Sequence, residues 1–209
     1  TDGTDIAGNG LDNSNVGAAV AFGDMNNDGY LDLYLTNSGQ ANVLFINDGE
    51  GVFSDATNSS GLGSNQLNSG TSAWADYDLD GFLDLYITNI GQNVLLRNDG
   101  DGLRFIDTAT DAGAGIGAIG EQNRVSWGTV FFDYDNDGDE DLYVVSGYLE
   151  DEPPSNPIEQ PNVLLRNNRD GTFTDVSSDS GADNPGIGRG GAYLDFDNDG
   201  CLDLFMTNL

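Results

Sequence analysis

Four short acidic segments hold the residues of this sequence that are best suited to chemistry. Each begins with Asp, places further oxygen-bearing side chains at positions three and five, and continues with Gly at position six and Asp at position nine. Side-chain oxygens at positions one, three, five and nine, with the backbone carbonyl of position seven, could surround one hard cation such as Ca²⁺, and glycine permits the sharp turn. The sequence therefore predicts four calcium ions, one in each segment.

The predicted ligands occupy equivalent positions in the four segments. They are Asp24, Asn26, Asp28, Tyr30 and Asp32; Asp76, Asp78, Asp80, Phe82 and Asp84; Asp133, Asp135, Asp137, Asp139 and Asp141; and Asp195, Asp197, Asp199, Cys201 and Asp203. Position seven varies in type, which is consistent with use of its carbonyl alone, so Cys201 is interpreted as a bystander. Asn26 carries one charge fewer than Asp78 at the same position, so the first site should bind more weakly than the second.

Other interpretations of these segments fit less well. An EF-hand loop opens in the same way but needs Glu at position twelve and flanking helices. Position twelve is apolar in all four segments: Leu35, Ile87, Val144 and Met206. Asp and Gly also form ordinary polar turns, but four copies with one spacing favour a shared ligand. Mg²⁺ demands tighter octahedral geometry. Zn²⁺ favours His and Cys ligands, and the chain has no His and a single Cys.

The residues around the acidic segments predict β-strands. After the first segment Leu31, Leu33 and Leu35 alternate with other residues, and a period of two is typical of a strand. Short stretches rich in small and aromatic residues precede the segments, at 18–23, 72–75, 129–132 and 191–194. An Asn-Val-Leu motif recurs at 42–47, 93–98 and 162–167, and each copy leads through a Gly-rich turn to a further short stretch at 52–55, 104–107 and 172–175. Each repeat thus reads as four antiparallel strands, with the acidic segment between the first two.

Four-stranded repeats of about 50 residues have the size of propeller blades. We expect an all-β fold of tandem antiparallel blades, three complete and one half, in a single array over residues 1–209. The blade units fall near 17–57, 70–110, 127–178 and 189–209, with 1–16 as the remnant of a preceding blade. Because strands alternate in direction, the acidic segments and the turns between third and fourth strands should share one face. The insertions at 114–126 and 147–161 should lie on the opposite face, where a ligand would bind.

The composition limits the partners and activities of the chain. It has 36 acidic and 6 basic residues and a formal charge of −30, so nucleic acid and anionic membrane surfaces are disfavoured. Bound cations would relieve the repulsion between these charges. The absence of His and Lys excludes His-dependent triads and phosphate loops that use Lys, and we expect no enzymatic activity. No run of apolar residues is long enough to span a membrane.

The acidic segments and their neighbours resemble FG-GAP/VCBS repeats, which form the β-propeller of integrin α chains. The resemblance lies in the Asp-rich segment ending in Asp-Leu, the preceding stretches at 19–24 and 191–196, and the companion Asn-Val-Leu-Leu-Arg-Asn and Gly-Thr-Phe-Thr-Asp motifs. In style the repeats are closest to those of the cartilage acidic protein type and of bacterial secreted proteins. The resemblance covers essentially the whole chain and implies a propeller, Ca²⁺ in the loops, an extracellular setting and a role in adhesion or recognition. Such propellers usually have about seven blades, whereas this chain has fewer than four.

These observations lead us to expect an extracellular calcium-binding structural or adhesive module. It would be part of a larger propeller or of a multi-subunit assembly, which could be filamentous, with subunits of the same kind or the rest of a longer chain as partners. The apolar strand expected at 202–208 would otherwise present an open edge. The alternatives are a lectin-like propeller that stacks glycans on Trp74, Trp127 or Tyr193, and an accessory domain of a secreted hydrolase.

Overall fold

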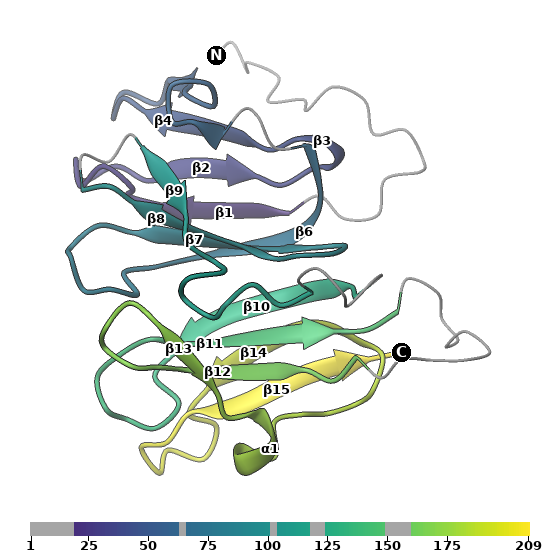
Figure 1. Ribbon diagram of the computed structural model, residues 1–209. Coiled ribbons are helices and arrows are strands. Elements are labelled where there is room, and N and C mark those ends of the chain that lie inside the picture. Colours follow the sequence, from purple (N-terminus) through teal and green to yellow (C-terminus); the bar gives the residue numbers. More distant parts are fainter. Residues whose placement is uncertain (1–18, 63–65, 101–103, 118–123, 149–159) are drawn as a thin grey trace.

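The fold is all-β, as the sequence predicts. The computed structural model describes residues 19–62, 66–100, 104–117, 124–148 and 160–209. These residues form fifteen strands and one short helix, α1 (Ser177–Ser180) (Figure 1). The N-terminal remnant expected at 1–16 and the acidic part of the insertion at 147–161 lie outside the described residues.

Each blade is an antiparallel sheet whose strands follow one another in chain order. The first contains β1 (Val20–Gly23), β2 (Asp32–Leu35), β4 (Val43–Asn47) and β5 (Phe53–Asp55); the second β6 (Gln66–Ala75), β7 (Asp84–Asn89), β8 (Val94–Asn98) and β9 (Phe105–Asp107). The third contains β10 (Ser126–Phe132), β11 (Asp141–Ser146), β12 (Val163–Asn167) and β13 (Phe173–Asp175), and the fourth pairs β14 (Gly188–Leu194) with β15 (Asp203–Asn208). Four-stranded blades with the acidic segment between the first two strands are thus confirmed.

One strand was not expected from the sequence. β3 (Ser38–Ala41) lies in the connection between β2 and β4 and pairs with the first half of β6, Ser38 opposite Asn68. Its Ser-Gly-Gln-Ala sequence has no apolar alternation, so periodicity gave no signal, and its pairing depends on backbone hydrogen bonds. β3 therefore joins the first blade to the second blade's sheet, and β6 is longer than the strand predicted at 72–75.

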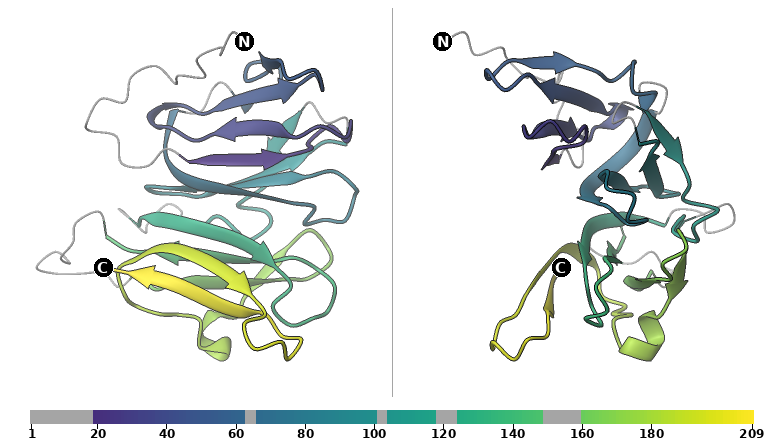
Figure 2. Two further views of the ribbon diagram at one scale, coloured as in Figure 1. Left: turned by 180° about the vertical axis from the view of Figure 1, so that it is seen from behind. Right: turned by 90° about the vertical axis from the view of Figure 1, so that its left-hand side faces the viewer.

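The second strands of the second and third blades are buried on both sides. Every residue of β7 and β11 is buried, although the sequence predicted strands that alternate between two faces. The reason is that the cores lie between consecutive blades. Tyr34 and Leu44 of the first blade pack with Leu85 of the second, and Tyr86 of the second packs with Leu142 of the third. Figure 2 shows the sheets following one another along a curve, so that each interior sheet has a neighbour on both faces.

Candidate metal centres

The four acidic loops (24–32, 76–84, 133–141 and 195–203) share one backbone conformation. Position four has a left-handed φ in each loop, in Asn27, Leu79, Asn136 and Asn198, and position six is a glycine with φ between 89° and 94°. In the second loop the N–H groups of Asp80 and Gly81 donate to the two carboxylate oxygens of Asp76, at 3.0 and 2.9 Å. The same pair of hydrogen bonds recurs in the other three loops. The repeated Asp-x-x-x-Asp-Gly spacing therefore gives four equivalent turns.

The aspartate at position nine begins the second strand and ties the loop to the end of the third strand. Asp84 is fully buried, and its Oδ1 accepts from the Asn98 N–H at 2.8 Å while its Oδ2 accepts from the Tyr77 N–H at 3.2 Å. Asp32 and Asp141 make the equivalent pairs of hydrogen bonds. These hydrogen bonds restrain the carboxylate at position nine in the first three loops and connect it to two other segments of its blade.

The carboxylates gather into clusters of the size that a metal ion requires. Asp76, Asp78 and Asp84 each offer an oxygen within 4.8 Å of the others, as do Asp133, Asp135 and Asp141, and Asp195, Asp197 and Asp199. In the first loop position three is Asn26, whose side-chain amide donates to Asp28 Oδ2 at 3.0 Å. The structure therefore brings together three of the four predicted side-chain ligands in the second, third and fourth loops.

Burial disfavours the charged form of several of these carboxyl groups when no positive charge lies nearby. Burial raises the pKa of Asp84 to about 8 and that of Asp141 to about 6, against the opposing effect of the backbone hydrogen bonds. It also raises the pKa of Asp32, and of Asp78 and Asp135, where further aspartates of the same loop add to the effect. These groups favour either a proton or a cation.

The second loop also contains a buried carboxylate oxygen that has no hydrogen-bond partner in the described part of the chain. Asp78 Oδ1 lies buried and makes no hydrogen bond within the described residues, while Oδ2 lies 3.7 Å from Arg97. A buried carboxylate oxygen without a partner is costly. The neighbouring groups that could bind a metal are the carboxylates of Asp76 and Asp84, and Ca²⁺ prefers oxygen ligands. The residues of the second and third clusters therefore fit a hard divalent ion.

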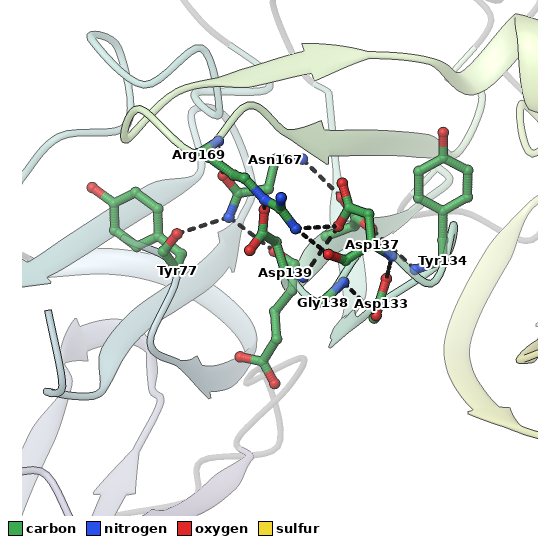
Figure 3. Close-up of polar contacts among 10 residues, drawn as sticks. Tyr77, Asp133, Tyr134, Asp137, Gly138, Asp139, Asn167 and Arg169 are labelled. Carbon is green, nitrogen blue, oxygen red and sulfur yellow. Dashed lines mark hydrogen bonds and ion pairs between the residues drawn. The ribbon is translucent and has the colours of Figure 1, made fainter. Parts of the chain in front are cut away.

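The side chains at position seven differ between the loops. Tyr30 lies over Gly49 of the adjacent hairpin, and Cys201 is exposed, whereas Asp139 is buried. Arg169 lies in the turn between β12 and β13. Its side chain pairs with Asp139 and also contacts Asp137 (Figure 3). These contacts place the acidic loops beside the turns between third and fourth strands, as predicted. Arg169 itself was missed by sequence reasoning, and its only signal is that Arg stands where the other two hairpins have Gly49 and Gly100.

Comparison with known proteins gives one family and one fold. The family model described as FG-GAP-like repeat matches residues 24–87, 76–144 and 150–206. Cartilage acidic protein 1 of Xenopus tropicalis is 28% identical over 202 residues, which cover 95% of this chain and 30% of that protein. The human protein of the same name is 25% identical over 195 residues, covering 92% and 28%. This chain thus spans about 30% of the length of the curated relatives that it matches.

A solved structure shows the same fold. It is a lectin of Agrocybe aegerita, described as specifically recognising non-reducing terminal N-acetylglucosamine, with a TM-score of 0.53 and 20% identity. The match covers 91% of this chain and 47% of the lectin. At this identity the likeness concerns architecture. Among the residues that the structure describes, no helix is long and apolar enough to cross a membrane.

Proposed function

We propose that this chain, which belongs to the FG-GAP-like repeat family, is a calcium-binding structural or adhesive module that functions outside the cell. The observation that carries the proposal is the second acidic cluster. Asp84 is fully buried, burial raises its pKa to about 8, and Asp78 beside it has a buried oxygen without a donor. A divalent cation among these oxygens would supply the charge that the site lacks.

The residues of the chain would hold the ion by bringing three segments of a blade together. The carboxylates at positions one, three and five come from the turn, and that at position nine comes from the start of the second strand. The position-nine carboxylate also accepts the N–H of the last residue of the third strand, as Asp84 does from Asn98. Calcium binding would therefore stabilise the blade, and four ions would offset part of the charge of −30.

An extracellular location agrees with this chemistry. The chain has one cysteine, so it cannot form an internal disulfide, and bound ions could act as staples instead. Extracellular modules bind calcium with dissociation constants of roughly 10⁻⁴–10⁻³ M, which suits loops whose outer carboxylates face solvent. Partners in this proposal are subunits of the same kind or further repeats of a longer chain, and the module itself has no enzymatic activity.

The aromatic residues considered for glycan stacking are engaged within the fold. Trp74 packs between Tyr34 and Phe105, with ring centroids 6.2 and 6.0 Å away. The Arg189 guanidinium covers the Trp127 ring, 4.4 Å from its centroid. These contacts favour the structural role over the lectin-like alternative at the two tryptophans.

Thermal unfolding in calcium and in excess EGTA, with metal analysis and calorimetric titration, tests the proposal. If each site is about 100-fold saturated, it stabilises the fold by roughly 2.7 kcal/mol, so EGTA should lower the Tm sharply. Asp76→Asn combined with Asp78→Asn should remove about one ion per chain. Asp111→Asn is the matched control, because Asp111 is exposed and lies outside the acidic loops. An identical Tm in calcium and EGTA, with no bound metal, would refute the proposal.

A further inference from the structure

Two buried asparagines each contact the acidic loops of two neighbouring blades. Asn98 is the last residue of β8, and its backbone N–H donates to Asp84 of its own loop while its side-chain amide donates to the carbonyl of Met25, 3.0 Å away in the preceding loop. Asn167, the last residue of β12, repeats this arrangement. Its N–H donates to Asp141 and its side-chain amide to the Tyr77 carbonyl at 2.7 Å (Figure 3).

The residues whose carbonyls accept these side-chain hydrogen bonds also donate their own N–H groups to the loop carboxylates. The Met25 N–H donates to Asp32 Oδ2 at 3.2 Å, and the Tyr77 N–H donates to Asp84 Oδ2 at 3.2 Å. The contacts therefore form one continuous path through three loops. It runs through Asp32, Met25, Asn98, Asp84, Tyr77, Asn167 and Asp141.

The path lies in the interior, where water cannot replace a broken hydrogen bond. Met25, Asn98 and Asp84 have no exposed surface, and Tyr77 and Asn167 are 2% and 4% exposed. In a low-dielectric interior, linked hydrogen bonds strengthen one another, and losing one leaves its partner unsatisfied at a cost. Fixing one carboxylate in this path should therefore help to fix the next.

We propose that Asn98 and Asn167 are positioning residues that couple adjacent calcium sites, so that an ion in one loop raises the affinity of the next. The inference rests on the proposed function. An ion in the first loop would hold Asp32, and with it Met25, whose carbonyl orients the Asn98 amide. The backbone of Asn98 would in turn hold Asp84 ready for the second ion. By thermodynamic reciprocity the second ion would favour the first equally.

The second loop is the best place to measure this coupling, because it has one asparagine link on each side. Its glycine N–H donates to Asp76, so the amide resonance of Gly81 reports calcium binding at that loop in an NMR titration. The first loop is disabled by Asp24→Asn with Asp28→Asn, and the third by Asp133→Asn with Asp137→Asn. All chains carry Asn27→Gly, because the exposed Asn27 amide forms a second link to the Gly81 carbonyl at 2.7 Å.

The expected result is a double dissociation between the two asparagines. With both present, disabling either neighbouring loop should raise the calcium midpoint of Gly81 about fivefold. Asn98→Ala should abolish the effect of disabling the first loop and leave that of the third, and Asn167→Ala should do the reverse. Direct Coulomb interaction between ions would survive both changes. Asn47→Ala is the control, because the Asn47 amide donates to Leu31 of its own blade.

The outcomes separate the inference from the function on which it rests. If Gly81 responds to calcium but its midpoint ignores the neighbouring loops, or if both asparagine variants keep the full coupling, the inference is overturned and the calcium sites stand. If no loop glycine responds to calcium, the proposed function fails and the coupling fails with it. The Hill coefficient of calcium binding, measured on the chain with both asparagines, does not depend on whether the asparagine variants fold. Positively coupled sites give a coefficient above about 1, whereas independent equal sites do not exceed it.

Discussion

The Arg169 side chain pairs with Asp139 from the hairpin position that Gly49 and Gly100 occupy in the first two blades. Arg169 has a φ of 60°, in the left-handed region that favours glycine. A Cβ atom at Gly49 would lie 2.4 Å from the Tyr30 ring, so Tyr30 requires glycine opposite it, whereas a Cβ atom at Gly100 would lie 3.8 Å from the Phe82 ring, in ordinary contact. The third blade replaces this aromatic–glycine contact with a charge pair.

Arg169→Gly should strengthen calcium binding at the third loop. The guanidinium lies 3.5 Å from Asp137 Oδ1, a predicted ligand, so its positive charge competes with the ion for that carboxylate. Removing it should lower the calcium midpoint of Gly138 about fivefold by a simple Coulomb argument. The midpoints are read from NMR titrations at constant salt. Arg104→Gln is the control, since Arg104 is exposed and lies on a different hairpin. A midpoint that rises in Arg169→Gly would mean that the arginine supports the site.

Asp84→Asn should destabilise the chain more in calcium than in EGTA. Because burial raises the pKa of Asp84 to about 8, its carboxyl group is mostly protonated at pH 7 without a cation, and asparagine matches that form in charge. The asparagine NH2 group cannot accept a hydrogen bond, so one of the N–H groups of Asn98 and Tyr77 loses its acceptor under both conditions. In calcium the variant should lose one site, roughly 2.7 kcal/mol at about 100-fold saturation, or a Tm lower by about 5–10 °C.

Asp84→Ala separates the carboxylate's two roles. It leaves the N–H groups of Asn98 and Tyr77 without their acceptor, so it should be destabilising in EGTA as well. Differential scanning calorimetry under both conditions checks the pair of variants. Equal losses for Asp84→Asn in calcium and EGTA would contradict an ion at this carboxylate.

The sequence predicted the repeats well because the local pattern and the fold agree. Each acidic loop is closed by hydrogen bonds among its own residues, such as Asp80 to Asp76, so its spacing alone determined its shape. The strand order followed from short connections between alternating strands.

What the sequence did not predict depends on contacts between blades. β3 was missed because its pairing with β6 uses backbone groups of residues without a hydrophobic pattern. The burial of both faces of β7 depends on neighbouring sheets, which a period of two does not reveal. The second role of Asn98, the bond to Met25 in another blade, joins residues that are 73 positions apart. Arg169 acts in the same way on a loop about 30 residues earlier in the chain.

Tyr86→Phe should destabilise the fold whether calcium is present or not. The buried Tyr86 hydroxyl donates to the Ala114 carbonyl at 2.8 Å and accepts from the Asn93 amide at 3.1 Å. Removing the hydroxyl leaves both groups short of a partner, which costs about 1–3 kcal/mol. Denaturant unfolding in calcium and in EGTA should show the same loss. Tyr193→Phe, at a tyrosine that is 42% exposed, should stay within about 0.5 kcal/mol of the parent chain.

Asn26→Asp should raise the calcium affinity of the first loop to that of the second. Asn26 is the one position-three ligand without a charge, and its amide donates to Asp28 Oδ2, occupying an oxygen that a cation would use. The substitution adds a carboxylate and frees that oxygen, so the calcium midpoint of Gly29 should fall by about tenfold, since ligand charge tunes affinity in such loops. Asp78→Asn is the matched reciprocal change and should weaken the second loop by a similar factor, read at Gly81. In EGTA the added charge should lower stability slightly, because it increases repulsion among Asp24, Asp28 and Asp32. If Asn26→Asp left the Gly29 midpoint unchanged while Asp78→Asn shifted that of Gly81, position three would bind the ion in the second loop but not in the first.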